Sequence, residues 1–108
     1  VLGRDYSLYG DTGRGNPAAY AMSKGGLVQL SRWMATTLAP SVRVNCLCFG
    51  GVARNQSKFF VERYVARTPL GRMATEEDFK GAIAFLASEL SAYVTGQVIM
   101  IDGGWTVW

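Results

Sequence analysis

Leucine and methionine recur along the first part of the chain with the period of an α-helix. The apolar stripe returns every three or four positions after Pro17 and comprises Leu27, Leu30, Met34 and Leu38. Asn16 followed by Pro17 is typical of a helix start, and Pro40 is a residue that no helix interior accommodates easily. We therefore predict one long helix within residues 16–39.

Two short runs are apolar at nearly every position, which favours strands. Val42–Phe49 is rich in β-branched residues and leads directly into Gly50–Gly51. Val98–Ile101 is apolar throughout, as in a strand of a parallel sheet that is covered on both faces, and it ends at Asp102–Trp105. We predict a strand and turn over residues 42–51, and a last strand at 98–101 within a unit spanning residues 75–104.

Two further helices are predicted between these strands. Phe59 to about Arg67 is a short amphipathic stretch within residues 55–70, and it suits either a lid over an apolar substrate or an ordinary surface helix. Thr75–Asp78 combines a capping residue with acidic residues, as at a helix start, and an apolar face follows at helical spacing: Phe79, Ala82, Ile83 and Leu86. Residues 1–15 are glycine-rich and predict a loop. The order of elements indicates an α/β fold whose two strands are parallel and joined by a right-handed crossover.

Composition limits the location and the chemistry. With 108 residues, 49% hydrophobic and 18% charged, the chain has room for one core. No apolar run reaches the roughly 18 residues of a membrane span, so we expect a cytoplasmic protein without a membrane partner. The basic residues behind the net charge of +3 are dispersed, so no nucleic-acid partner is predicted. Because the chain has no histidine, and Cys46 and Cys48 are two positions apart in one strand, we expect free thiols and neither a zinc site nor a histidine-based triad.

One pair of residues is suited to acid–base chemistry. Tyr20 lies in the first turn of the predicted long helix and Lys24 one turn later, so both side chains project from the same face, about 6 Å apart. A cation beside a phenol favours the phenolate, which makes Tyr20 a candidate proton donor or acceptor and Lys24 its tuning partner. An exposed aromatic residue and a solvated lysine would have the same spacing.

Gly25 and Gly26 follow this pair inside the predicted helix. Each costs up to about 1 kcal/mol relative to alanine in such a position. The cost predicts a close approach of another group to the backbone, and a sheet, a cofactor or a partner helix would each fit. Simple tolerance of the glycines is the alternative.

The motifs, taken in order, resemble the carboxyl-terminal, catalytic half of the short-chain dehydrogenase/reductase family, over nearly the whole chain. Tyr20–Gly26 is similar to its Tyr-x-x-x-Lys segment on a long interface helix, and Val42–Asn45 with Gly50–Val52 is similar to the next strand and its nicotinamide-side turn. The closing motifs of the family match Pro69–Arg72, Glu76–Glu77, Ala84–Ser88, Val94–Gln97 and Asp102–Trp105.

The resemblance implies a fold, a reaction and roles for particular residues. The fold would be the carboxyl-terminal half of a doubly wound Rossmann-type parallel sheet, present here as a single partial domain over residues 1–108. The activity would be an NAD- or NADP-dependent interconversion of a small-molecule carbonyl and alcohol by hydride transfer. Tyr20 would transfer the proton, Lys24 would assist it and bind the nicotinamide ribose, and Val52 would offer its backbone to the carboxamide. The cofactor would be contacted by Tyr20 and Lys24 and by the turn Phe49, Gly50, Gly51 and Val52.

Several family features differ here or do not occur. Phe49 stands where the family usually has proline, and Arg54 where a threonine often contacts the cofactor. Ser7 precedes Tyr20 by 13 positions, a spacing that the family uses for its catalytic serine, but its surroundings predict a loop, so we expect that serine upstream of Val1. The glycine-rich cofactor turn also belongs to the half that precedes this chain in the family. We therefore expect weak or absent cofactor binding by this chain alone and self-association through the long helix; a truncated, inactive, oligomerising α/β module is the alternative.

Overall fold

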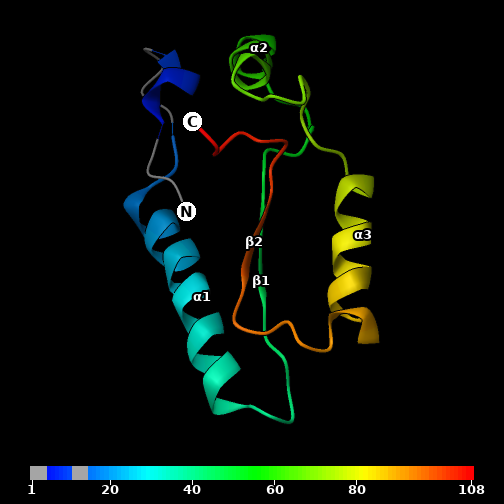
Figure 1. Cartoon of the computed structure of the whole chain (residues 1–108). Helices are drawn as coiled ribbons and strands as arrows, with labels where there is room; N and C mark the ends of the chain where they lie inside the picture. Colours follow the sequence, from blue (N-terminus) through cyan, green and yellow to red (C-terminus); the bar gives the residue numbers. More distant parts are fainter. Residues whose placement is uncertain (1–4, 11–14) are drawn as a thin grey trace.

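The computed structural model of the protein describes residues 5–10 and 15–108. Two parallel strands lie between two helices, and a third helix lies beyond the carboxyl ends of the strands (Figure 1). The elements in chain order are the 3-10 helix η1 (Tyr6–Leu8), α1 (Ala18–Thr37), β1 (Cys46–Phe49), α2 (Lys58–Ala66), α3 (Glu77–Leu86), the 3-10 helix η3 (Glu89–Ser91) and β2 (Val98–Ile101).

Helix α1 confirms the predicted long helix but begins differently. Pro17 occupies the N-cap with extended backbone, its carbonyl accepts from the Tyr20 amide at 3.0 Å, and no side chain caps this end. The expected cap by Asn16 is therefore wrong, because proline's fixed φ of −66° combines here with an extended ψ. The helix ends where Leu38 donates to the Met34 carbonyl at 2.9 Å, two residues before Pro40.

Strands β1 and β2 pair in parallel, with Cys46 opposite Val98 and Phe49 opposite Ile101. β1 is shorter than the predicted strand, because the Val44 amide donates to the Thr95 hydroxyl and the Gln97 amide to Asn45 Oδ1, both at 3.1 Å, in place of backbone partners. The side chains of Arg43 and Asn45 also hold the segment before β2. The Arg43 guanidinium donates to the Leu86 and Val94 carbonyls at 3.0 and 3.2 Å, and the Asn45 amide group donates to the same Val94 carbonyl at 2.9 Å. These contacts lead the chain from α3 into β2 in the correct register.

Helix α2 packs against the buried core of the chain. Tyr64 is buried in a cluster with Leu8 of η1, Met73 and Trp105. Phe60, Val61 and Val65 of α2 pack against the same cluster. The apolar residues of this helix, for which the sequence left a lid and an ordinary surface helix as alternatives, thus have a permanent partner in η1 and the segment after β2.

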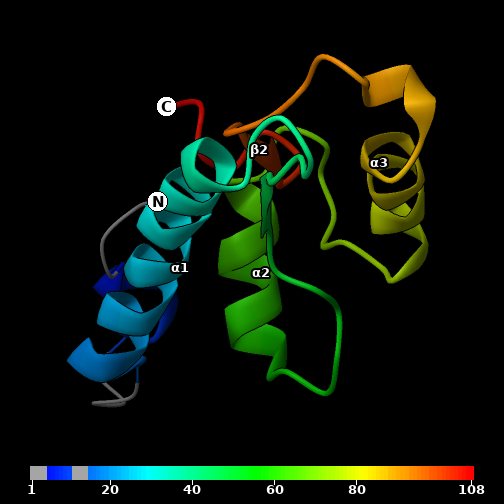
Figure 2. The same ribbon diagram turned by 90° about the horizontal axis from the view of Figure 1, so that it is seen from below.

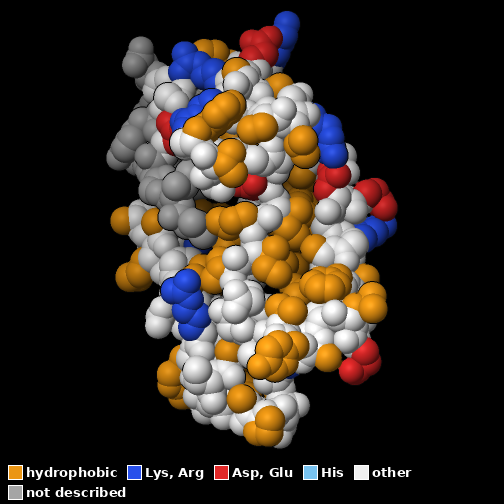
Figure 3. Space-filling model, viewed as in Figure 1, with side chains coloured by type: hydrophobic (Ala, Val, Ile, Leu, Met, Phe, Trp, Pro, Cys, Tyr) orange, Lys and Arg blue, Asp and Glu red, His pale blue; other side chains and the backbone are white. Residues whose placement is uncertain are grey.

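Helices α1 and α3 flank the sheet on opposite sides, as both views show (Figures 1 and 2). Apolar side chains gather down the middle of the face in Figure 3, over the region between these helices. β2 is half-buried throughout, not covered on both faces as predicted for Val98–Ile101, and β1 is half-buried except at the exposed Phe49. The two-stranded sheet also leaves its edges open. Large apolar side chains on α1 are exposed, including Met22, Leu27 and Trp33.

The predicted loop over residues 1–15 contains η1 in its described part, and residues 1–4 and 11–14 lie outside the described residues. Leu8 of η1 is buried, which ties this segment to α2. Among the described helices, none combines the length and the apolar character that a membrane span needs.

Candidate functional site

Tyr20 and Lys24 share one face of α1. The Lys24 Nζ lies 5.6 Å from the centroid of the Tyr20 ring, so the cation faces the ring. Tyr20 is 46% exposed and Lys24 is exposed, which leaves the phenol open to a reacting molecule. Ser23 donates to the Tyr20 carbonyl at 2.8 Å within the same turn. The predicted proximity of the two side chains is confirmed.

The two glycines of the same helix have open surroundings. A Cβ added at Gly25 or Gly26 would meet no heavy atom of the described chain within 4 Å, its own helix backbone aside. The sheet of this chain is therefore not the group that these glycines accommodate. A cofactor and a partner helix remain as explanations of a close approach.

The turn after β1 is enclosed closely by the rest of the chain. A Cβ at Gly50 would stand 2.8 Å from the Asp102 Cα, and a Cβ at Gly51 would stand 2.8 Å from the Tyr64 Cζ. Such distances exclude a side chain at either position without rearrangement. Phe49, at the end of β1, is turned toward α3, where its ring centroid lies 4.0 Å from that of Phe79.

Hydrogen bonds fix the backbone of this turn. Gly50 donates to the Ile101 carbonyl at 2.9 Å, and the Gly51 carbonyl accepts from the Ala74 amide at 2.9 Å. The Val52 carbonyl accepts from the side-chain amide of Gln56 at 2.8 Å, and the next amide, of Ala53, donates to the Ala74 carbonyl at 2.8 Å. Within residues 5–10 and 15–108, the amide of Val52 has no partner. No contact between described residues therefore occupies this donor.

Tyr20 and this turn are presented by neighbouring elements. Helix α1 packs alongside β1, and the turn follows β1 directly. No hydrogen bond, ion pair or ring contact between described residues joins Tyr20 or Lys24 to residues 49–52. The structure thus places the two parts of the predicted site on adjacent elements without direct contact.

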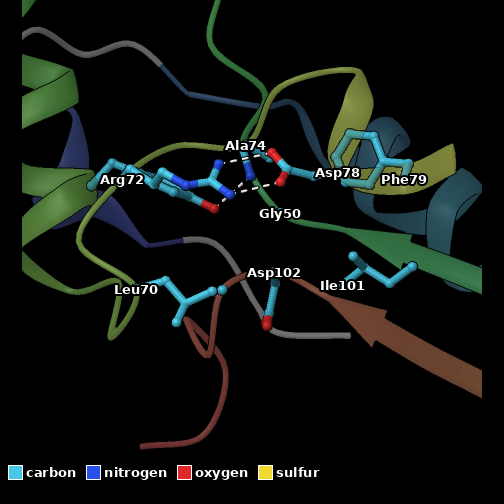
Figure 4. Close-up of a pocket in the computed structure, with 11 residues that line it drawn as sticks. Gly50, Leu70, Arg72, Ala74, Asp78, Phe79, Ile101 and Asp102 are labelled. Atoms are coloured by element: carbon cyan, nitrogen blue, oxygen red, sulfur yellow. Dashed lines mark hydrogen bonds and ion pairs between the residues drawn. The ribbon is translucent and has the colours of Figure 1, made fainter. Parts of the chain in front are cut away.

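A cavity of about 210 Å³ opens beside the turn after β1 (Figure 4). Arg72 and Asp78 face one another on one wall, with two N–H···O bonds of 2.6 and 2.8 Å, and Leu70 and Ile101 lie across from them. The hydrogen bonds from Arg72, and a further one from the Thr75 amide, hold the pKa of Asp78 well below its ordinary value. Tyr20 and Lys24 do not line this cavity. The sequence drew attention to Arg72 only as part of a family motif, because nothing in its spacing indicates its partner.

Arg54 and Ser7, the two positions in question from the sequence, have structural partners. Arg54 forms an exposed ion pair with Glu76, and its amide donates to Gln56. The Ser7 hydroxyl donates to the Asp5 carboxylate at 2.6 Å, and Arg63 of α2 donates to the Ser7 carbonyl. These bonds fasten η1 to α2.

Cys46 and Cys48 are free, as predicted, and both are half-buried. Burial, followed by the neighbouring Cys46, raises the pKa of the Cys48 thiol. In the part of the chain that the structure describes, no three His, Cys, Asp or Glu side chains are grouped so that they could hold a metal ion.

Comparison with known proteins identifies the family. Residues 6–106 match the family model described as Enoyl-(Acyl carrier protein) reductase. The chain belongs to the short-chain dehydrogenase/reductase family of oxidoreductases. The predicted fold, part of a doubly wound Rossmann-type domain, is thereby confirmed.

Two solved structures and one curated relative illustrate the similarity. A short chain dehydrogenase from Leptospira borgpetersenii with bound NAD+ is 43% identical, with a TM-score of 0.83, and the match covers 93% of this chain and 42% of that one. A gluconate 5-dehydrogenase from Burkholderia cenocepacia in complex with NADP and tartrate is 30% identical, with a TM-score of 0.82 and coverages of 94% and 43%. The 3-oxoacyl-[acyl-carrier-protein] reductase of Thermotoga maritima is 39% identical over 102 residues, which is 90% of this chain and 40% of the relative. The chain thus spans about two fifths of the length of the proteins it matches.

Proposed function

We propose that this chain is the catalytic half of a cytoplasmic NAD- or NADP-dependent oxidoreductase that interconverts a small-molecule carbonyl and its alcohol. Because the chain spans about two fifths of its relatives, the activity is proposed for a whole enzyme that contains it. The observation that carries the proposal is the position of Lys24 Nζ, 5.6 Å from the ring centroid of an exposed Tyr20.

The residues of the turn after β1 fit a nicotinamide cofactor. Gly50 and Gly51 bring bare backbone to the carboxyl end of a parallel strand, where ligands of doubly wound folds bind. The free amide of Val52 suits the oxygen of a carboxamide, while its carbonyl already accepts from Gln56. Phe49, Gly50, Gly51 and Val52, with Tyr20 and Lys24, would therefore hold the nicotinamide end.

NAD or NADP, when bound, would supply or accept the hydride. Tyr20 Oη would donate a proton to the carbonyl oxygen as it becomes an alcohol, or remove that proton in the reverse direction. Lys24 would keep a positive charge beside the ring that carries the developing negative charge. The 46% exposure of Tyr20 leaves room for the substrate to approach the phenol oxygen.

A hybrid enzyme tests the proposal. In it, this chain replaces the matching 40% of the Thermotoga 3-oxoacyl reductase, whose own amino-terminal part supplies the rest of the cofactor site. A short 3-oxoacyl thioester is the probe, in the substrate class of that relative's name. We expect oxidation of NADH or NADPH at 340 nm that requires the thioester.

A matched hybrid carrying Tyr20→Phe is the control for background turnover, because this change leaves Lys24 in place to contact the cofactor. Cofactor fluorescence on mixing shows independently that each hybrid folds and binds. A hybrid that binds NADPH or NADH but turns over no faster than this control contradicts the proposed catalytic role of the chain.

We also propose that the protein is a homo-oligomer that associates through α1. Leu27 and Leu30 are about half exposed, and Met22 and Trp33 are 75% and 60% exposed. An exposed apolar stripe of this kind favours burial against another chain. The same observation favours the second candidate function, an inactive α/β module that serves only to oligomerise.

A further inference from the structure

Tyr64 is a buried aromatic residue beside the turn after β1. It is 7% exposed, and its ring stacks on that of Trp105 in the same cluster and on that of Phe60, which packs against the cluster. The ring centroids lie 6.0 Å from Phe60 and 5.5 Å from Trp105, with interplanar angles of 22° and 13°. This packing fixes the direction in which the Tyr64 hydroxyl leaves helix α2.

The hydroxyl of Tyr64 reaches the turn itself. Its oxygen accepts a short hydrogen bond from the amide of Gly51. It also lies 3.0 Å from where a Cβ would stand on Gly50, and the ring lies 2.8 Å from a Cβ on Gly51. The closeness of Tyr64 is therefore one reason why positions 50 and 51 are glycines.

The amides of Gly50, Gly51 and Ala53 are held by different parts of the molecule. β2 holds the amide of Gly50, and the segment after α2 holds that of Ala53 through Ala74. Among the described contacts, Tyr64 alone holds the amide of Gly51. Because Gly50 and Gly51 have little conformational preference of their own, this bond decides how their peptide is oriented.

The next donor, the amide of Val52, belongs to the Gly51–Val52 peptide, whose carbonyl accepts from the Ala74 amide at 2.9 Å, while the Tyr64 bond fixes the peptide on the other side of Gly51. The two bonds together therefore determine where the Val52 amide points. We propose that Tyr64 is a positioning residue that aims the Val52 amide at the nicotinamide carboxamide, an inference that rests on the proposed function of this turn. Tyr64 acts through Gly51 and does not itself touch the cofactor.

Helix α2 also lines a second cavity. Phe60, one helical turn before Tyr64, lines a space of about 420 Å³ together with Leu8 and Tyr9, and the Phe60 ring lies 5.5 Å from that of Tyr9. The same helix links the wall of this cavity to the turn.

Amide hydrogen exchange in the 108-residue chain tests the bond. Tyr64→Phe keeps the ring and removes only the hydroxyl, and Tyr93→Phe is the matched control because Tyr93 is fully exposed. We expect exchange at Gly51 to accelerate about tenfold in Tyr64→Phe, as for the loss of one buried hydrogen bond, with no change in Tyr93→Phe. Unchanged exchange at Gly51 would overturn the proposal.

Kinetics of the hybrid enzyme test the consequence. In Tyr64→Phe we expect the KM for the cofactor to rise about fivefold to tenfold, with kcat changed less than twofold, whereas a loss of folded enzyme would lower kcat and leave KM unchanged. Faster exchange at Gly51 with an unchanged KM would overturn the positioning role. If the hybrid shows no turnover before any substitution, the proposed function fails, not the proposed role of Tyr64. The exchange rate at Gly51 would still decide whether Tyr64 orients the turn.

Discussion

The ammonium of Lys24 lies 5.6 Å from the centre of the Tyr20 ring, one turn further along α1. Both residues are on the exposed part of the helix, so this arrangement does not contribute to the core. A lysine held beside a solvent-facing phenol has a clear chemical use, and it connects the helix to the reaction that we propose.

Removing the Lys24 charge should impair both turnover and cofactor affinity. In the hybrid enzyme, Lys24→Ala is expected to lower kcat/KM at least about tenfold, because in the proposed function the cation would assist proton transfer and would contact the cofactor. Lys58→Ala is the control, since that lysine forms only an exposed ion pair on α2. Steady-state kinetics with varied cofactor measure both effects, and equal rates in the two variants would contradict the role of Lys24.

A side chain at Gly51 should destabilise the fold. Gly51→Ala brings a Cβ to 2.8 Å from the Tyr64 ring and 3.0 Å from Met73, and overpacking of this kind costs about 1–3 kcal/mol of unfolding free energy. Gly81→Ala on α3 meets no described atom within 4 Å and should stabilise the helix by up to about 1 kcal/mol. Urea denaturation of both variants measures the difference. The account fails here if Gly51→Ala is as stable as Gly81→Ala.

The ion pair of Arg72 and Asp78 should make stability depend on pH. The pKa of Asp78 is held below its ordinary value of 3.8, so its contribution is present above that pH and is lost as the pH falls toward the lowered pKa. We expect the stability difference between the wild type and Asp78→Asn to be constant from pH 7 to 5 and to shrink below about pH 4. Thermal unfolding across this range measures it, with Glu62→Gln as control. A stability difference between the two proteins that grows as the pH falls would contradict this prediction.

The 108-residue chain by itself should bind NADH and NADPH poorly and should self-associate. Doubly wound folds hold the pyrophosphate at a Gly-x-Gly-x-x-Gly turn between a strand and a helix, and this sequence has no such turn. Residues such as Met22 and Trp33 leave apolar surface open on α1. Calorimetric titration and sedimentation over a concentration series measure the two properties. Micromolar binding by a stable monomer would contradict both expectations.

Element types were predictable from the sequence, because periodicity reports which face of an element is apolar. The stripe through Leu27 and Leu30 identified α1, and the uniformly apolar Val98–Ile101 identified β2. The boundaries were less predictable. β1 begins at Cys46 rather than Val42 because side chains replace backbone partners before it: the Val44 amide donates to the Thr95 hydroxyl and the Gln97 amide to Asn45 Oδ1, contacts between distant positions that no local pattern reveals.

The residues of the candidate site were also predictable only in part. Tyr20 and Lys24 were found because their spacing along one helix determines their proximity. The role of Tyr64 could not be found, since its contact with Gly51 depends on how α2 packs after an intervening loop. The packing of α2 could not be found for the same reason: its apolar residues pack against Leu8 and Trp105, which are distant in sequence.

Substitution of Tyr20 tests the central claim most directly. In the hybrid enzyme, Tyr20→Phe removes the proton donor and little contact area, so kcat should fall by about 10²–10⁴-fold while cofactor binding, followed by fluorescence titration, stays nearly unchanged. Tyr93→Phe, at a fully exposed position, should retain full activity. A Tyr20→Phe enzyme that retains more than about a tenth of the wild-type rate would contradict the assignment of Tyr20 as the group that transfers the proton.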